Sequence, residues 1–273
     1  MKTGKKIAII ILIIGILLLV TGIVLFIAGI GRSKWETESF TETFDEEIKA
    51  IEINCDIGEL IIEHSSDATN AEVKCVEVIA DKFDVTLNDG TLIIEYQSEK
   101  WHKYISIGTL NDDISKGEIY VTLPEKELDK MAIKTGAGET SINSLTVKNA
   151  DIYAGIGEFT ISDCSFTKEI DIKTGIGDFV VKNSVLNNLD FDAGIGKSSL
   201  KKCDLTGICK IDNGVGEVSI SLTRSRDYYS FDLDNGVGDI DIDGEKMLDE
   251  EVADKTIISI DNGIGSIDVQ CAS

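Results

Sequence analysis

Apolar and polar residues alternate along most of the chain from residue 46 onward. In segments such as 170–172, 189–191 and 240–242, a single aspartate lies between two residues of Ile, Leu or Phe. A period of two places the apolar side chains on one face of a β-strand and the polar side chains on the other. The pattern therefore predicts an all-β domain over residues 46–273.

A Gly-x-Gly core recurs seven times in the second half, and successive cores are 19 to 27 residues apart. A unit of about 20 residues cannot bury its apolar face alone, but it can when it stacks on similar units. The repeat predicts a right-handed single-stranded β-solenoid, parallel β-helix-like, with irregular first coils over 46–130 and regular coils over 131–273. The core glycines are Gly136, Gly138, Gly155, Gly157, Gly175, Gly177, Gly194, Gly196, Gly214, Gly216, Gly236, Gly238, Gly263 and Gly265.

These glycines are interpreted as structural turns. We expect the chain to turn sharply at both glycines of each core, because only glycine takes a positive φ without a steric penalty. The apolar residue between them is expected to be tucked into the corner of the coil. The rival interpretation is a sandwich of β-hairpins with Gly-x-Gly loops. The near-constant spacing argues against it, as does the position of Cys164, Ser184 and Cys203, all seven residues after a core glycine.

The N-terminal segment 7–30 carries no charged residue and follows three lysines. It is long enough to cross a bilayer as one helix, and the lysines favour a cytoplasmic N-terminus. We therefore expect a cytoplasmic segment 1–6, a transmembrane helix 7–30, a polar tether 31–45 and an extracytoplasmic domain 46–273, which makes the chain a single-pass protein of the cell membrane. A cleaved signal peptide is the alternative, although its apolar core is usually shorter.

Small residues repeat every seven positions in this apolar segment. Such a seam on a membrane helix lets a second helix approach closely. The seam consists of Ala8, Gly15, Gly22 and Gly29.

The chain is strongly acidic, with a net charge of −23. This charge excludes nucleic acid as a partner and favours basic partners or divalent cations. Three aspartates, each two residues before a core glycine, are expected to stack on consecutive coils and are candidate calcium ligands. They are Asp212, Asp234 and Asp261.

Nothing else in the sequence predicts a catalytic residue, a cofactor or a metal site. His64 and His102 have no cysteine or carboxylate at metal-ligand spacing, and no Gly-x-Ser-x-Gly motif is present. Coils of about 20 residues leave little chain to wall a substrate cleft, so a glycan-active β-helix enzyme is only a remote alternative. Among the six cysteines, Cys55 and Cys75 are the pair considered for a disulfide, and the others are expected to fill the core.

Two interruptions of the repeat, 224–229 and 243–255, are expected to form loops on the side opposite the glycine corner. Insertions into a regular scaffold often carry binding residues. Both are therefore candidate partner-binding segments.

The repeat resembles a known family. Ile-Lys-Thr-Gly-Ala-Gly-Glu at 133–139, Ile-Lys-Thr-Gly-Ile-Gly-Asp at 172–178 and Ile-Tyr-Val-Thr-Leu-Pro at 119–124 are similar to the bacterial "putative adhesin" family of unknown function. That family includes membrane-anchored LiaG-like proteins associated with cell-envelope stress operons. The resemblance covers about residues 46–270 and implies a β-solenoid at the cell surface without an established enzymatic activity.

The function expected from these observations is a non-enzymatic, membrane-anchored interaction module in envelope organisation or stress sensing. Its expected partner is another envelope or membrane protein. The alternative is a carbohydrate- or cation-binding surface module that attaches the cell to a polymer.

Overall fold

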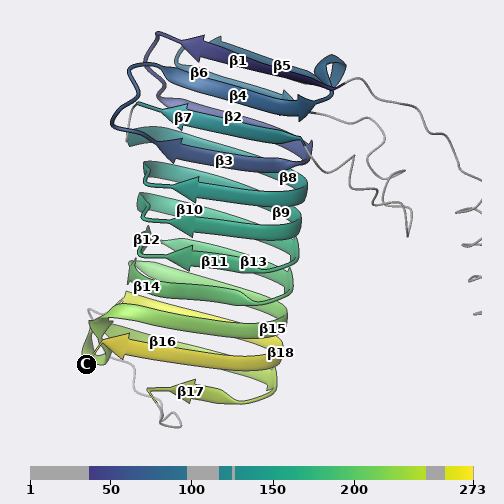
Figure 1. Cartoon of the computed structure of the whole chain (residues 1–273). Coiled ribbons are helices and arrows are strands. Elements are labelled where there is room, and N and C mark those ends of the chain that lie inside the picture. Colours follow the sequence, from purple (N-terminus) through teal and green to yellow (C-terminus); the bar gives the residue numbers. More distant parts are fainter. Residues whose placement is uncertain (1–36, 97–116, 125–126, 244–255, 273) are drawn as a thin grey trace, which may run out of the picture.

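The computed structural model describes residues 37–96, 117–124, 127–243 and 256–272. The described residues form a tall stack of strands with β1 at one end and β17 at the other (Figure 1). The strands are β1 (Glu38–Phe44), β2 (Ala50–Ile57), β3 (Glu59–His64), β4 (Ala71–Val78), β5 (Phe83–Asn88), β6 (Thr91–Tyr96), β7 (Glu118–Leu123), β8 (Glu127–Asn143), β9 (Thr146–Ser162), β10 (Ser165–Ile176), β11 (Phe179–Lys182), β12 (Val185–Asn187), β13 (Leu189–Ile195), β14 (Ser198–Thr206), β15 (Ile208–Ser225), β16 (Tyr229–Val237), β17 (Ile240–Ile242) and β18 (Thr256–Ala272).

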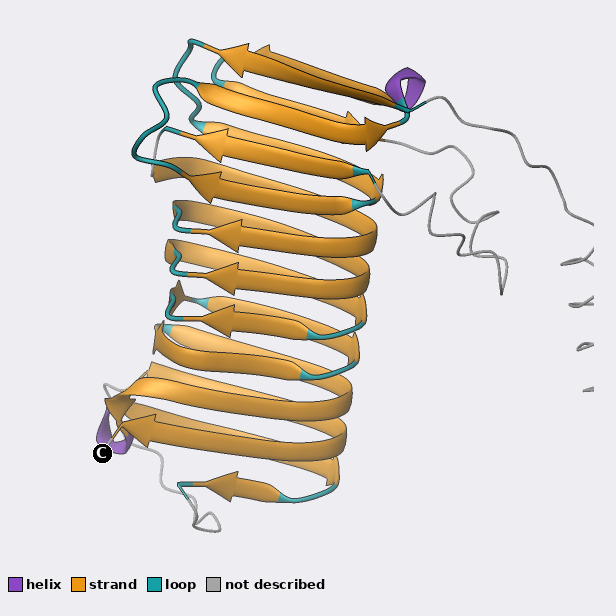
Figure 2. Ribbon diagram, in the orientation of Figure 1, coloured by secondary structure: helices purple, strands orange, loops and turns teal. Residues whose placement is uncertain are grey.

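Each regular coil bends once at its Gly-x-Gly core, so that the stack has two broad faces. On the first face, before the core, Ile152 of β9 pairs in parallel with Ile133 of β8 and Ile172 of β10. On the second face, after the core, β9 pairs in parallel with β8 and β11. Figure 2 shows the bends gathered along one edge and the loops along the other. This is an all-β, β-solenoid-like fold, as the repeat predicts. The right-handed sense stays a prediction.

The inner side chains of the two faces form one continuous core. Phe179, for example, packs against Phe159 and Phe191 of neighbouring coils, with ring centroids 5.8 and 4.5 Å apart. At the loop edge, Cys164 and Ser184 lie on adjacent coils, and the Cys164 amide donates to the Ser184 hydroxyl at 3.1 Å. Residues at equivalent positions of successive repeats therefore lie next to each other on neighbouring coils.

The coils do not stack in chain order at the C-terminal end. β18, the last strand in sequence, lies between β15 and the strands β16 and β17, and pairs in parallel with all three. The inner residues Ile258 and Ile260 of β18 are fully buried, whereas Phe231 and Leu233 of β16 are only half-buried. The difference in burial follows from position, because β18 is covered by a coil on each side whereas β16 lies at the end of the stack.

The N-terminal end is also reordered. β2 lies between β6 and β8, and β3 lies between β7 and β8. β1, β4 and β5 pair antiparallel with their neighbours, so segments 71–78 and 83–88 are not part of the parallel coils. Residues 38–44, expected in the polar tether, form β1. A tight hairpin at 88–90 joins β5 to β6 through Asp89 and Gly90, which have φ of 49° and 76°.

The helices of the described chain are two short 3-10 turns, η1 (Ala80–Lys82) and η2 (Arg226–Tyr228). No helix in this part of the chain is long and apolar enough to cross a membrane. The predicted localisation as a single-pass membrane protein with a cytoplasmic N-terminus is therefore not supported by the described chain. Segment 7–30 and the seam Ala8, Gly15, Gly22 and Gly29 lie outside the described residues.

Candidate binding surface at the glycine corner

The two glycines of each core serve different purposes. The second glycine has a positive φ in every regular coil, for example 141° at Gly177, whereas the first does not. The first is needed because adjacent corners come close together: a Cβ on Gly175 would lie 2.4 Å from the carbonyl oxygen of Gly155. The expectation that both glycines take a positive φ is therefore wrong for the first of each pair, where close backbone approach is the reason for glycine.

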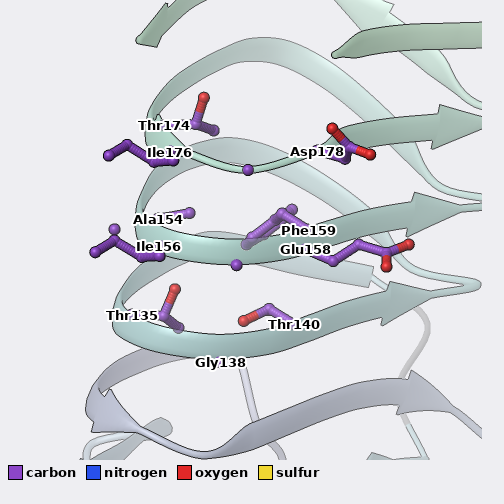
Figure 3. Close-up of a pocket in the computed structure, with 13 residues that line it drawn as sticks. Thr135, Gly138, Thr140, Ala154, Ile156, Glu158, Phe159, Thr174, Ile176 and Asp178 are labelled. Carbon is purple, nitrogen blue, oxygen red and sulfur yellow. The ribbon is translucent and has the colours of Figure 1, made fainter. Parts of the chain in front are cut away.

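The apolar residue between the two glycines points out of the coil, which corrects the expectation that it is tucked inside. The inside of the corner is already filled by two other side chains. They belong to Ala154, one residue before the first glycine, and Phe159, two residues after the second glycine. Ile156 and Ile176 point away from the stack in Figure 3. We call the exposed residues at this position, which are 42% to 65% exposed, the corner ridge. They are Ile156, Ile176, Ile195, Val215, Ile264 and Val237.

The corner ridge is continuous along the stack. Each of its residues is in register with the next in the order just given, from Ile156 on β9 to Val237 on β16. With neighbouring strands about 4.8 Å apart, the five steps span about 24 Å. An uninterrupted row of exposed aliphatic side chains is the type of surface that marks an interaction site on a soluble domain.

Carboxylates lie on both sides of the corner ridge. On the second-face side, the residue after the second glycine is acidic in most coils, and Figure 3 shows Glu158 and Asp178 pointing away from Ile156 and Ile176. The acidic residues of this row are Glu139, Glu158, Asp178, Glu217 and Asp239. Two residues interrupt it: Ser266, which pairs with Glu217, and Lys197, whose Nζ lies 3.0 Å from Glu217 Oε2.

On the first-face side, four aspartates stack three residues before the last four ridge residues, whereas Tyr153 and Lys173 occupy this position beside Ile156 and Ile176. Their spatial order is Asp192, Asp212, Asp261 and Asp234, because β18 lies between β15 and β16. The three calcium candidates from the sequence are thus brought together, but in another order and with Asp192 added. Asp212 forms an ion pair with Lys210. Within the described residues no group of three or more His, Cys, Asp or Glu side chains could hold a metal ion, so the geometry adds no support for calcium.

An asparagine ladder, missed in the sequence analysis, lies inside the corner of the last three coils. Asn213 Nδ2 donates to Asn262 Oδ1 at 2.7 Å, and Asn262 Nδ2 donates to Asn235 Oδ1 at 3.1 Å. Asn262 is fully buried. The signal in the sequence is Asp-Asn-Gly, which precedes the corner in these three coils alone. The ladder joins β15, β18 and β16 in their spatial order.

The acidic row continues to the N-terminal coils, where Glu118, Glu59 and Glu139 follow one another on adjacent strands. Burial, then repulsion by Glu118 and Glu139, raises the pKa of the Glu59 carboxyl above its ordinary value. The folded protein therefore binds this proton more tightly than the unfolded chain does. The resulting penalty on stability is present above the folded pKa and disappears as the pH falls below the unfolded value.

We accordingly expect Glu59→Gln to stabilise the protein by about 0.5 kcal/mol near neutral pH, because it removes like charges on adjacent rungs. The difference from the parent should vanish as the pH falls below the ordinary value of 4.5. Urea unfolding of both proteins across this pH range measures it. Glu63→Gln is the control, since Glu63 lies between Thr122 and Asn143 and should change little. Equal effects of the two substitutions would contradict the electrostatic explanation.

The other candidate residues lie away from the corner or outside the described chain. His64 Nδ1 lies 3.2 Å from the Leu123 carbonyl oxygen, and His102 is outside the described residues. The Cys55–Cys75 disulfide is not formed, and burial raises the pKa of both thiols to about 12. Residues 244–255 of the second candidate insertion also lie outside the described residues.

The insertion at 224–229 forms η2 at the loop edge, opposite the glycine corner (Figure 1). Its Arg224 donates two hydrogen bonds of 2.6 Å to the carboxylate of Asp204 and lies over the ring of Tyr228. These contacts hold the insertion against the stack.

The fold and this corner define an all-β, solenoid-like protein with one exposed apolar edge. The chain belongs to the family described as Toastrack DUF4097, whose model matches residues 48–261. The family resemblance expected from the Gly-x-Gly repeat is thereby confirmed. No curated protein matches the chain.

Solved structures similar to this chain come from several bacteria. A "putative cell adhesion protein" from Clostridium sporogenes ATCC 15579 is 14% identical with a TM-score of 0.37, over 87% of this chain and 100% of that chain. A "putative adhesin" from Bacteroides fragilis NCTC 9343 is 16% identical with a TM-score of 0.40, over 87% and 99%. A "putative lipid binding protein" from Parabacteroides distasonis ATCC 8503 is 14% identical with a TM-score of 0.33, over 88% and 98%.

Proposed function

We propose that this protein is a non-enzymatic, adhesin-like interaction module that binds another polypeptide along the corner ridge. The observation that carries the proposal is the register of six exposed Ile and Val side chains on six successive rungs. The proposal concerns binding only, and envelope organisation and stress sensing stay predictions from the sequence.

The fold has no need of large apolar side chains at this position. The corner requires glycines on both sides, but the residue between them points into solvent, and Ala137 occupies it in the first regular coil. A polar residue there would favour solubility, since exposed Ile and Val add nothing to the core. Their burial against a partner would contribute favourable free energy in proportion to the apolar area removed from water.

A photo-crosslinking residue in place of Ile195 tests the proposal in the full-length protein in its own cells. We expect a discrete crosslinked polypeptide that is lost when Ile176→Ser and Val215→Ser are added. Both flanking residues are exposed, so these two substitutions should leave the free energy of unfolding within about 0.5 kcal/mol of the parent. Urea unfolding of the purified protein checks that the loss is not caused by misfolding.

The matched control position is Ile208, which is 66% exposed and lies seven residues before Val215 on the same strand. A crosslinker at Ile208 should not capture the same polypeptide, and Ile208→Ser should leave capture at position 195 unchanged. Equal capture at both positions, or capture that persists without the flanking ridge residues, would refute binding along the corner ridge.

A further inference from the structure

We infer that the partner segment is a cationic amphipathic α-helix that lies along the corner ridge, one helical turn per rung. This inference rests on the proposed function and adds the conformation and charge of the partner. It is carried by the spacing of the corner ridge, by its width and by the charge of the two rows beside it.

The spacing of the ridge matches a helix. Ridge side chains repeat about every 4.8 Å, and the apolar row of an amphipathic helix repeats about every 5.4 Å, once per turn. Over five steps the two rows drift apart by about 3 Å, less than one rung. In an extended segment, side chains on one face repeat about every 6.6 Å and drift by about 9 Å over the same five steps, nearly two rungs. A helix can therefore place one apolar residue against each ridge residue, and a strand cannot.

The width of the corner also matches a helix. Glu158 lies two residues after Ile156, and Asp192 lies three residues before Ile195. The acidic rows thus lie about 7 to 10 Å along the chain from the ridge. A helix with its side chains is about 10 to 12 Å across, so residues that flank its apolar stripe would lie above these rows.

The charges of the rows select a basic helix. The row on the second-face side is acidic over Glu139, Glu158 and Asp178, and the row on the first-face side is acidic from Asp192 to Asp234. In the described chain, Glu139 and Glu158 form no ion pair. A lysine or arginine of the helix would meet a carboxylate on the second-face side beside Ile156 and Ile176, on the first-face side beside Ile195 and Ile264, and on both sides beside Val215 and Val237. Lys173, on the first-face side beside Ile176, is a position where a cation would be repelled.

The same charges disfavour a second copy of this chain as the occupant. Two ridges packed against each other would bring acidic rows against acidic rows, between molecules that each carry a net charge of −23. Like charges held this close at an interface cost binding free energy. Self-association through the ridge is therefore an outcome that would overturn the inference.

Synthetic peptides of roughly 21 residues, about 32 Å as a helix, test the inference against the full-length protein. Three peptides of identical leucine and lysine composition are compared: one with leucine in a helical stripe, one with strict alternation and one scrambled. A fourth has the helical stripe with glutamate in place of lysine. Fluorescence anisotropy measures binding of each labelled peptide. We expect the cationic stripe peptide to bind at least about tenfold more tightly than the other three.

Variants of the protein locate the binding. Ile176→Ser with Ile195→Ser and Val215→Ser should weaken the stripe peptide about tenfold, and Ile208→Ser should have no effect. Glu158→Gln with Asp178→Asn should weaken binding and reduce its dependence on salt. Unchanged binding to the ridge variant, or equal binding of the scrambled peptide, would overturn the inference. So would tighter binding of the alternating peptide, or sedimentation that shows a dimer lost in the ridge variant.

The two proposals fail in different ways. If crosslinking at position 195 depends on the ridge but the stripe peptide does not bind, the ridge is a binding surface for another class of partner and only the helix is refuted. If neither the crosslink nor the peptide depends on the ridge, both are refuted.

Discussion

Gly177→Ala is expected to lower the free energy of unfolding by about 4 kcal/mol or more, enough to unfold a marginal protein at ambient temperature. Gly177 has a φ of 141°, and a Cβ there would lie 1.8 Å from the carbonyl oxygen of Gly157 on the neighbouring coil. Rotating a side chain relieves neither the strained backbone nor this contact, because the backbone fixes the position of the Cβ and the carbonyl oxygen is itself a backbone atom. Urea unfolding of the purified variant measures the loss.

Gly117→Ala is the matched control for this substitution. Gly117 is buried and Gly177 is half-buried, but Gly117 has no positive φ, and a Cβ there would meet its nearest atoms at 3.6 Å, an ordinary contact. We expect a change within about 0.5 kcal/mol. If the two alanines were equally harmful, or equally harmless, the corner glycines would not be required by close backbone approach.

Asn262→Ala is expected to cost about 3 kcal/mol. Removing the buried middle amide leaves the buried Asn213 Nδ2 and the half-buried Asn235 Oδ1 without this partner, and a buried polar group without a partner costs about 1 to 3 kcal/mol. Urea unfolding again measures the cost. Asn143→Ala, which removes an amide on the second face with no side-chain hydrogen bond among the described residues, should change little.

The comparison with Asn235→Ala tests the order of the coils. In the structure Asn262 lies in the middle of the ladder and Asn235 at its end, so loss of Asn262 should be the more harmful. If the coils stacked in chain order, Asn235 would lie in the middle and the ranking would reverse. A larger effect at Asn235 would therefore contradict the insertion of β18 between β15 and β16.

Local sequence was enough to predict the coils themselves. The period of two in segments such as 170–172 decides which side chains enter the core, and the recurrence of Gly-x-Gly decides where each coil bends. These are short-range properties, since strand alternation and glycine geometry depend on residues only a few positions apart. The hairpin at 88–90 was predictable for the same reason.

The order of the coils and the composition of the corner surface were decided by tertiary structure. The repeats resemble one another closely, so the alternation within each coil does not say which coil will be its neighbour, and only the folded stack places β18 between β15 and β16. The side chain between the two glycines points outward because other side chains fill the inside of the corner. These side chains include Ala154 and Phe159 and those of the coils above and below.

The chain alone thus determined that it forms stacked β-coils with glycine corners, because each coil carries its own alternation and its own turn. Only the folded stack decided that Ile156, Ile176 and their neighbours form one exposed ridge with carboxylates beside it. That surface is assembled from residues about 20 positions apart, and their alignment depends on the register between strands.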